Sequence, residues 1–256
     1  MKFGVCSKDN LEYLGDIGYD YFEISLSHLS SLPDEEYEKY KNTILSTGLK
    51  AEAANLFLPA GFSIVDGTRS ADEIRDYAEK AFSRFAAVGG AIAVLGSSGQ
   101  RRIPDGLAYE EAYSRFVDAI TIFCRVAEKY NITVAVEPLN TDETNLINTV
   151  AQAAELCQKV DLANFGCIAD IYHIHKNNES ISTIREFKNY IKHIHLSRRN
   201  NDRKMPFEAS DIDDCKELAI LLKEIGYNDR ISLECGLVPN FEDGAKAMMR
   251  TFEIFK

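Results

Sequence analysis

The sequence predicts an α/β fold, a (β/α)8 TIM barrel that forms a single domain over residues 1–256, and three observations support it. Short apolar runs alternate strictly with amphipathic segments along the whole chain. Eight such pairs in 256 residues match the usual size of a closed eight-stranded barrel. No stretch rich in Pro, Gly or Ser divides the chain, so we expect one domain.

The apolar runs are the expected strands, because a short apolar run bounded by turn residues is typical of a buried strand. In chain order they are FGVC (3–6), YFEIS (21–25), LKAEAAN (49–55), AIAVLG (91–96), ITVAVE (132–137), FGCIAD (165–170), IKHIHL (191–196) and RISLE (230–234). Since a helical segment follows each run, the strands should be parallel and joined by helical crossovers.

The amphipathic segments predict eight helices, because their apolar residues recur at helical spacing. They cover 8–17, 34–47, 70–88, 107–130, 144–160, 180–189, 212–225 and 241–255. Ser70 followed by Glu73 is typical of a helix-capping box, and Gly48 and Asp105-Gly106 lie at helix ends. A doubly wound open sheet is the alternative, but the first run leads into CSKDN and has no GxGxxG phosphate loop.

The composition disfavours several partners and locations. A formal net charge of -11 repels phosphate backbones and anionic lipids, so neither nucleic acid nor a membrane is an expected partner. No apolar run approaches the ~20 residues of a membrane span. The six cysteines form no CxxC pair and lie mostly in apolar runs, as buried thiols in a reducing compartment do. Since MKFGVCSKDN lacks a signal-peptide core, we expect a cytoplasmic protein.

Four consecutive strands end in a potential metal ligand. These residues are Glu137, Asp170, His195 and Glu234. In a TIM barrel the active site forms at the C-terminal ends of the strands, where inward side chains converge on one axis. The sequence therefore predicts that these four side chains lie together at that end of the barrel.

Alternation along the strands tests whether the four side chains point inward, because residues two apart share a face. If they do, the outward set is Ile132, Val134, Val136, Phe165, Cys167, Ala169, Ile194, Leu196, Ile231 and Leu233. This set is apolar, as a surface covered by helices should be, and Lys192 near a strand start is the exception. The opposite orientation would bury three carboxylates against helices, which is costly for unpaired charges.

Three carboxylates and one imidazole in a low-dielectric pocket repel one another strongly unless a cation lies among them. One divalent metal ion is therefore the expected cofactor. Oxygen-rich ligation with a single histidine favours Mn²⁺, with Mg²⁺, Co²⁺ or Zn²⁺ as alternatives, and the lack of a two-histidine set argues against a non-haem iron oxygenase. Pairing of the carboxylates with arginines at the barrel rim is the structural alternative.

These motifs resemble those of the sugar phosphate isomerase/epimerase superfamily, the xylose-isomerase-like TIM barrels. The resemblance rests on VAVEPLN, ADIYH, HIHLS and the SLE that follows KEIGYNDR, with GYDYFEI and GSSGQRRIPDG as further matches. It covers nearly the whole chain, and its site pattern is most similar to that of the ketose 3-epimerases. The resemblance implies that Glu137, Asp170, His195 and Glu234 bind one divalent metal ion, and that the two glutamates also form the acid/base pair.

The resemblance also implies two substrate contacts. His173, three residues after the aspartate of ADIYH, should contact the substrate. An arginine in the loop after the strand-seven histidine should bind a substrate hydroxyl or carbonyl, and Arg203 in NDRKMP is the candidate. That loop is longer than in the family, and Phe207 follows the proline where the family has Gly, so Arg198 and Arg199 compete for the role.

Further candidates come from other strand ends. Glu23 ends the second strand and is expected to bind substrate or to orient a neighbour. Arg101 and Arg102 follow the fourth strand and are expected to meet an anionic substrate group. His193 shares the inward face with His195 but lies ~6.5–7 Å deeper along the strand. It is therefore expected to be a hydrogen-bonded core histidine.

The expected function is that of a metal-dependent isomerase or epimerase acting on a sugar, a sugar phosphate or a related keto-polyol through an enediolate. A dehydratase of a cyclic polyol or keto acid could use the same residues, and a non-catalytic sugar-binding barrel is the second alternative. An abasic-site endonuclease would need further histidines at the strand ends, which the chain lacks. The expected partner is a small sugar or sugar derivative, and the sequence leaves a homo-oligomer open.

Overall fold

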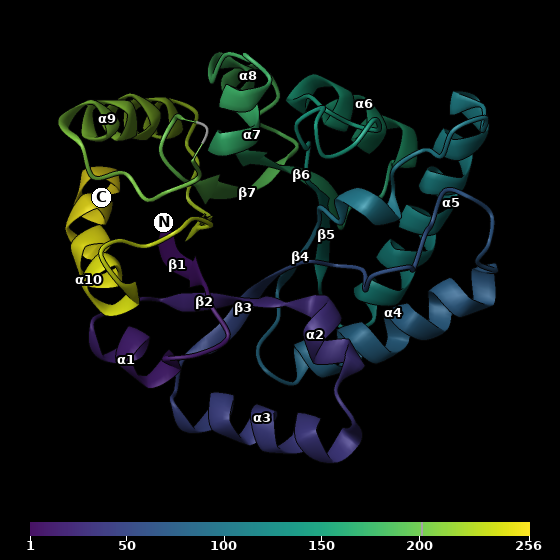
Figure 1. Ribbon diagram of the computed structural model, residues 1–256, viewed down its shortest axis with the longest axis horizontal. Coiled ribbons are helices and arrows are strands. Elements are labelled where there is room, and N and C mark those ends of the chain that lie inside the picture. The colour runs from purple at the N-terminus through teal and green to yellow at the C-terminus, as the bar shows by residue number, and fades with distance from the viewer. Residues whose placement is uncertain (201) are drawn as a thin grey trace.

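The strands form a closed parallel barrel in the order β1-β2-β3-β4-β5-β6-β7-β8, so the predicted TIM barrel is confirmed. The structure is a computed structural model that describes residues 1–200 and 202–256. Strand β8 pairs with β1 and closes the ring. Figure 1 shows the helices arranged outside the ring of strands, with the N-terminus beside the C-terminal helix.

All eight strands begin and end within one residue of their predicted bounds. They are β1 (Lys2–Cys6), β2 (Tyr21–Ser25), β3 (Lys50–Asn55), β4 (Ile92–Leu95), β5 (Thr133–Val136), β6 (Phe165–Asp170), β7 (Ile191–Leu196) and β8 (Arg230–Leu233). Strand bounds are predictable here because the apolar side chains on both faces are buried, which marks each strand sharply in the sequence.

The helices follow the predicted order, with two short additions. They are α1 (Leu11–Asp16), α2 (Leu26–Ser31), α3 (Asp34–Ser46), α4 (Ala71–Ala86), α5 (Tyr109–Glu128), α6 (Val150–Val160), α7 (Ile171–Lys176), α8 (Ser182–Glu186), α9 (Ala209–Glu224) and α10 (Phe241–Phe252). Helices α2 and α7 were not predicted, and neither was the 3-10 turn Ser98–Gln100. Each follows a strand within a few residues, at the end of the barrel where the candidate site lies.

The prediction for α6 was wrong at its start, because the helix begins at Val150 and not at residue 144. Ile147 has a φ of 58°, which interrupts a helical backbone. Thr149 then caps the helix by accepting a hydrogen bond from the Gln152 backbone N–H, and the Gln152 side chain bonds back to residue 149. Residues 137–149 therefore form a loop over the barrel end.

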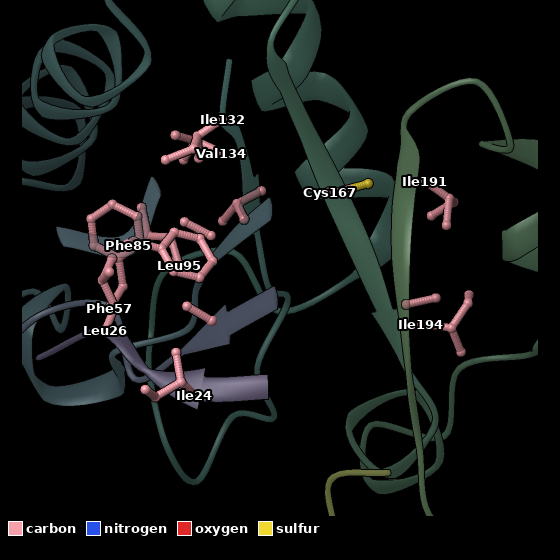
Figure 2. Packing of buried hydrophobic residues seen from close by; sticks show 14 of the residues in the cluster. Ile24, Leu26, Phe57, Phe85, Leu95, Ile132, Val134, Cys167, Ile191 and Ile194 are labelled. Atoms are coloured by element: carbon pink, nitrogen blue, oxygen red, sulfur yellow. The ribbon is translucent and has the colours of Figure 1, made fainter. Parts of the chain in front are cut away.

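The predicted inward and outward faces of the strands are confirmed. The outward residues of β5 to β8 belong to the large apolar layer between strands and helices, of which Figure 2 shows part, from Ile24 to Ile194. A separate small cluster fills the barrel interior. Its members are Tyr21, Ala53, Ile92, Val94, Ala135 and Ile168. Because Ala135 and Ile168 lie inside, the side chains two residues further along β5 and β6 also point inward.

The two ends of the barrel differ in how their charges are neutralised. At the N-terminal end, the Glu52 carboxylate lies 2.7 Å from Lys2 Nζ and 2.7 Å from Arg230 Nη2. The Tyr21 ring packs against Gly4, where a Cβ would lie only 2.4 Å from the ring. The N-terminal end is thus filled and charge-balanced, as the stability-bearing end of a TIM barrel usually is.

Two other expectations concern the cysteines and membrane-spanning helices. All six cysteines are free, as predicted. Among the described helices, none combines the length and the apolar character that a bilayer crossing requires.

Candidate active site

The four predicted ligand residues lie together at the C-terminal end of the barrel. Glu137, Asp170, His195 and Glu234 each offer one ligand atom, and these atoms all lie within 4.8 Å of one another. His195 Nδ1 is 2.9 Å from Glu234 Oε2, 3.3 Å from Glu137 Oε1 and 3.7 Å from Asp170 Oδ2. The parallel register brings them together, since Asp170 on β6 is paired directly with His195 on β7.

The local backbone makes room for these side chains. A Cβ on Gly96, just after β4, would lie 2.3 Å from Glu137 Oε2, so only glycine leaves space for the carboxylate there. Asp170 ends β6 and also caps α7, because its Oδ1 accepts from the backbone N–H groups of Tyr172 and His173. That leaves Oδ2 free to face the other candidate ligands.

Crowding of like charges perturbs the carboxyl groups. Burial, together with the charge of Glu234, raises the pKa of Glu137 to about 8. Burial by itself would raise the pKa of Asp170 as well, but the charges of His173 and Arg203 outweigh it and hold that pKa well below its usual range. Burial would lower the pKa of His195, but nearby carboxylates, Glu23 foremost, raise it well above its usual range.

This donor set fits a divalent metal ion. Three buried or half-buried carboxylates and one imidazole nitrogen converge within 4.8 Å, and oxygen-rich sets of this kind suit hard or borderline divalent cations. Within the described chain, Arg203 is the side-chain cation that reaches the carboxylates, with Nη2 at 2.9 Å from Asp170 Oδ2 and in contact with the Glu234 carboxylate. Pairing with a rim arginine, the structural alternative to a metal ion, is therefore also present, between Arg203 and the carboxylates of Asp170 and Glu234.

The structure decides which arginine of the loop after β7 faces this site. Arg203 lies over the Tyr172 ring at 4.7 Å and has a φ of 47°, an unusual backbone for a non-glycine residue. Arg198 instead pairs with Asp202 and Glu208, and Arg199 pairs with residues of α9. Asn201, which begins the NDRKMP stretch, lies outside the described residues.

His173 points its Nε2 atom at the same site. Its Nδ1 accepts a hydrogen bond from the Asn140 backbone N–H at 3.1 Å, so the ring proton belongs on Nε2. Nε2 is 3.7 Å from Asp170 Oδ2 and 3.9 Å from Glu137 Oε1. Burial lowers the pKa of His173, which disfavours the charged form of the ring.

A cavity of about 240 Å³ opens above the candidate ligands. Its walls combine carboxylates, small hydroxyl groups and leucines. They are formed by Ser27, Leu56, Leu58, Gly96, Ser97, Ser98, Gln100, Glu137, Leu139, Glu143, His173, Arg203 and Glu234. Leu56 and Ser97 at the rim have positive φ values of 44° and 43°, and strained backbone of this kind often lies at functional sites.

Sequence reasoning missed Glu143, which lines the cavity. Asn140 Nδ2 donates to Glu143 Oε1 at 2.8 Å and also lies 2.9 Å from His173 Nδ1, so one side chain orients two cavity residues. Glu143 lies in a loop without alternation or helical spacing, and only its position shortly after a candidate ligand could have drawn attention to it.

Three predicted substrate contacts lie elsewhere. Glu23 is 1% exposed and lies beneath His195, not along the cavity. Arg101 is fully buried and donates to the Glu137 backbone oxygen at 2.5 Å, while Arg102 is exposed outside the cavity walls. None of the three residues lines the cavity, which corrects the expectation for Arg101 and Arg102. Glu23 contacts His195 Nε2 at 2.9 Å, which agrees with the alternative expectation that it orients a neighbour. The expected core role of His193 is confirmed, since its buried Nε2 bonds to Glu23 Oε2 at 3.0 Å.

Comparison with known proteins identifies several similar chains. Residues 11–253 match the family model of the xylose isomerase-like TIM barrel. The inosose isomerase of Bacillus licheniformis is 26% identical over 94% of this chain and 88% of its own. The 3-keto-D-glucoside 4-epimerase of E. coli superposes with a TM-score of 0.79 at 21% identity, covering 100% of this chain and 98% of that one. The D-allulose 3-epimerase of Methylomonas sp. gives 0.82 at 19% identity, covering 99% and 98%. The two structural matches show a shared fold.

Proposed function

The chain belongs to the xylose isomerase-like TIM barrel family, and from that premise we propose that it is a metal-dependent isomerase or epimerase of a neutral sugar or related keto-polyol. The observation that carries the proposal is the convergence of Glu137, Asp170, His195 and Glu234 beneath a cavity of about 240 Å³. Its relatives include an inosose isomerase, a probable ketose 3-epimerase and a D-psicose 3-epimerase, whose names point to the same class of chemistry.

The four converging residues would hold one divalent metal ion. When bound, such an ion polarises a substrate carbonyl and stabilises negative charge on the adjacent oxygens. Mn²⁺ is the proposed ion, with Mg²⁺, Co²⁺ and Zn²⁺ as alternatives, because the set contains three carboxylates and no cysteine. The oxygens of Asp170 and Glu234 that face this point are also those that contact Arg203.

Glu137 and Glu234 are the proposed acid/base pair. They directly follow β5 and β8, and His195 Nδ1 lies 3.3 Å from Glu137 Oε1 and 2.9 Å from Glu234 Oε2. One carboxylate would remove the proton from the carbon next to the carbonyl, leaving an enediolate. The other would return a proton to the opposite face of that carbon, which inverts the centre. Return of the proton to the neighbouring carbon would give an aldose–ketose isomerisation instead.

His173 and Arg203 are the proposed donors to substrate oxygens. His173 carries its proton on Nε2, and Arg203 Nη1 lies 3.4 Å from that atom, so the two groups flank one point in the cavity. A carbonyl or hydroxyl oxygen at this point would accept from both. Their role would be to fix the reacting carbon between the two glutamates.

The cavity walls favour an uncharged substrate. Among the described residues that line it, Arg203 is the single cation, and it already contacts two carboxylates. Glu137, Glu143 and Glu234 would repel a phosphate group. Ser27, Ser97, Ser98 and Gln100 provide hydroxyl and amide groups that suit sugar hydroxyls. We therefore favour a free ketose or cyclic keto-polyol over a sugar phosphate.

Hydrogen exchange at carbon tests the proposal. The Mn²⁺-loaded protein is incubated in D₂O with a panel of ketoses, cyclic keto-polyols and ketose phosphates. We expect carbon-bound deuterium in a neutral substrate with wild type and with Glu186→Gln, a control at an exposed glutamate of α8. Glu137→Gln and Glu234→Gln should lower the exchange rate by about 100-fold or more.

The same experiment separates the alternatives. Deuterium uptake together with a product that has lost one water molecule relative to the substrate would identify the dehydratase chemistry. Tight binding of a sugar without any exchange by the metal-loaded wild type would support the non-catalytic sugar-binding barrel and contradict our proposal. Cytoplasmic location stays a prediction, and a homo-oligomer stays open.

A further inference from the structure

Glu23 occupies the barrel interior directly beneath the candidate metal centre. It lies on β2, 1% exposed, with both carboxylate oxygens engaged. Oε1 is 2.9 Å from His195 Nε2, and Oε2 is 3.0 Å from His193 Nε2. The two histidine rings, both from β7, lie 5.0 Å apart and nearly perpendicular. One carboxylate thus joins two stacked layers of the barrel interior.

This geometry determines where the ring protons lie. A carboxylate only accepts hydrogen bonds, so each Nε2 must donate its N–H to Glu23. For His195 the other ring nitrogen, Nδ1, faces the carboxylates of Glu137, Asp170 and Glu234, so in the metal-free protein it would carry a proton as well. A bound metal ion would replace that proton, and Nδ1 would then be the nitrogen that offers its lone pair.

We propose that Glu23 is a positioning residue for the metal, which fixes the tautomer and the ring orientation of His195 so that Nδ1 is presented as the ligand. This inference rests on the proposed metal-dependent function. A carboxylate behind a metal-bound histidine is a recurrent arrangement, because it holds the ring and increases its basicity. In the β7 sequence HIH, His195 would then be the metal ligand, and His193 would hold the Glu23 carboxylate in place.

The surroundings of His193 agree with a supporting role. The side chain is fully buried, and its Nδ1 has no hydrogen-bond partner among the described residues. Its one polar contact is therefore the bond to Glu23 Oε2. That bond anchors the far oxygen of the carboxylate and prevents the group from rotating away from His195.

Metal affinity and ring nitrogen spectra test the inference. Mn²⁺ affinity is measured by competition with a chelating dye for wild type, Glu23→Gln and Glu23→Ala. The amide in Glu23→Gln keeps the shape of the side chain but can accept from only one histidine. We expect both variants to bind Mn²⁺ about 10- to 100-fold more weakly than wild type.

Glu186→Gln is the control. Glu186 is an exposed glutamate of α8, and it takes no part in the bonds that Glu23 makes to the histidines. We expect this variant to bind Mn²⁺ with near wild-type affinity. Circular dichroism confirms that each variant is folded before its affinity is compared.

The spectroscopic readout is independent of stability. In Zn²⁺-loaded wild type, long-range nitrogen–proton correlations should show His195 protonated at Nε2, with Nδ1 bound to the metal. Unchanged Mn²⁺ affinity in folded Glu23→Gln and Glu23→Ala, or a wild-type His195 protonated at Nδ1, would overturn the inference and leave the proposed function intact. A wild type that binds none of these metals would overturn both.

Discussion

Glu137 is the residue at which the geometry of the site is most constrained. Its carboxylate faces His195 on one side and the backbone of Gly96 on the other. A side chain at residue 96 must therefore push the carboxylate out of place. The site depends on this glycine because the Glu137 carboxylate lies close to its Cα, and not because Gly96 has an unusual backbone angle.

Gly96→Ala should weaken metal binding while leaving the fold intact. The added Cβ would lie 2.3 Å from Glu137 Oε2, so the carboxylate has to rotate away from the other ligands. We expect a loss of Mn²⁺ affinity of about 10-fold or more, as for other disturbances next to a ligand. Gly99→Ala is the control, since a Cβ at residue 99 meets nothing within 4 Å. Equal affinities of the two variants would contradict the assignment of Glu137 as a ligand.

The raised pKa of Glu137 predicts a pH dependence for the metal-free protein. The folded-state pKa is about 8, whereas an unfolded glutamate titrates near about 4.3. Between these values the unfolded chain has lost its proton and the folded chain keeps it, so raising the pH favours unfolding. Stability due to this group is therefore full below about pH 4.3 and is lost as the pH rises through about 8.

Thermal unfolding of the chelator-treated protein measures this effect. Glu137→Gln carries no titrating proton, so its melting temperature should rise relative to wild type between pH 5 and pH 8. We expect the difference to grow by about 3 °C or more, which corresponds to roughly 1 kcal/mol for a chain of this size. A difference that stays constant or shrinks over this range would show that the folded pKa is not raised.

At the level of single residues, the sequence predicts what lies on strands and misses what lies in loops. The four candidate ligands follow from strand ends and from the two-residue period of side-chain direction. Glu143 and the choice of Arg203 depend on loop backbones with unusual φ angles, such as the 47° of Arg203. No periodic pattern encodes these angles.

At the scale of secondary-structure elements, the loop 137–149 connects a ligand strand to the helix that covers it. Asn148 Nδ2 donates to the backbone oxygens of Leu139 and Thr144 and closes the loop on itself. The capping box of Thr149 and Gln152 then starts α6. The loop carries Asn140 and Glu143 over the cavity because both of its ends are fixed.

Thr149→Ala should destabilise the protein without altering the reaction site directly. It removes the side-chain oxygen that accepts from the Gln152 backbone N–H at 3.1 Å. Urea denaturation should show a loss of about 1 kcal/mol. Thr149→Ser retains the hydroxyl and should lose much less. If the two variants are equally stable, the capping box does not determine where α6 begins.

The short helices α2 and α7 are less predictable than the long ones. Each has six residues, too few to show an apolar stripe at helical spacing. Both begin at a strand-end residue whose side chain caps them, Ser25 for α2 and Asp170 for α7. In α7 the capping residue is also a candidate ligand, so local structure and site geometry depend on the same carboxylate.

At the scale of the whole molecule, the barrel separates stability from reactivity. Glu52 at the N-terminal end is neutralised by Lys2 and Arg230. The carboxylates at the C-terminal end exceed the cations around them, and a metal ion would restore the balance. Strict alternation of strands and helices predicts this architecture, because seven crossovers of one hand bring the eighth strand beside the first and close the sheet.

The central claim is that this end of the barrel exchanges a carbon-bound proton of a neutral keto-sugar with the help of a metal ion. Deuterium incorporation by the Mn²⁺-loaded protein measures that step directly. The account predicts incorporation with wild type and its near abolition in Glu137→Gln and Glu234→Gln. Wild type that binds Mn²⁺ but exchanges no proton in any neutral ketose or cyclic keto-polyol, or variants that exchange as fast as wild type, would contradict it.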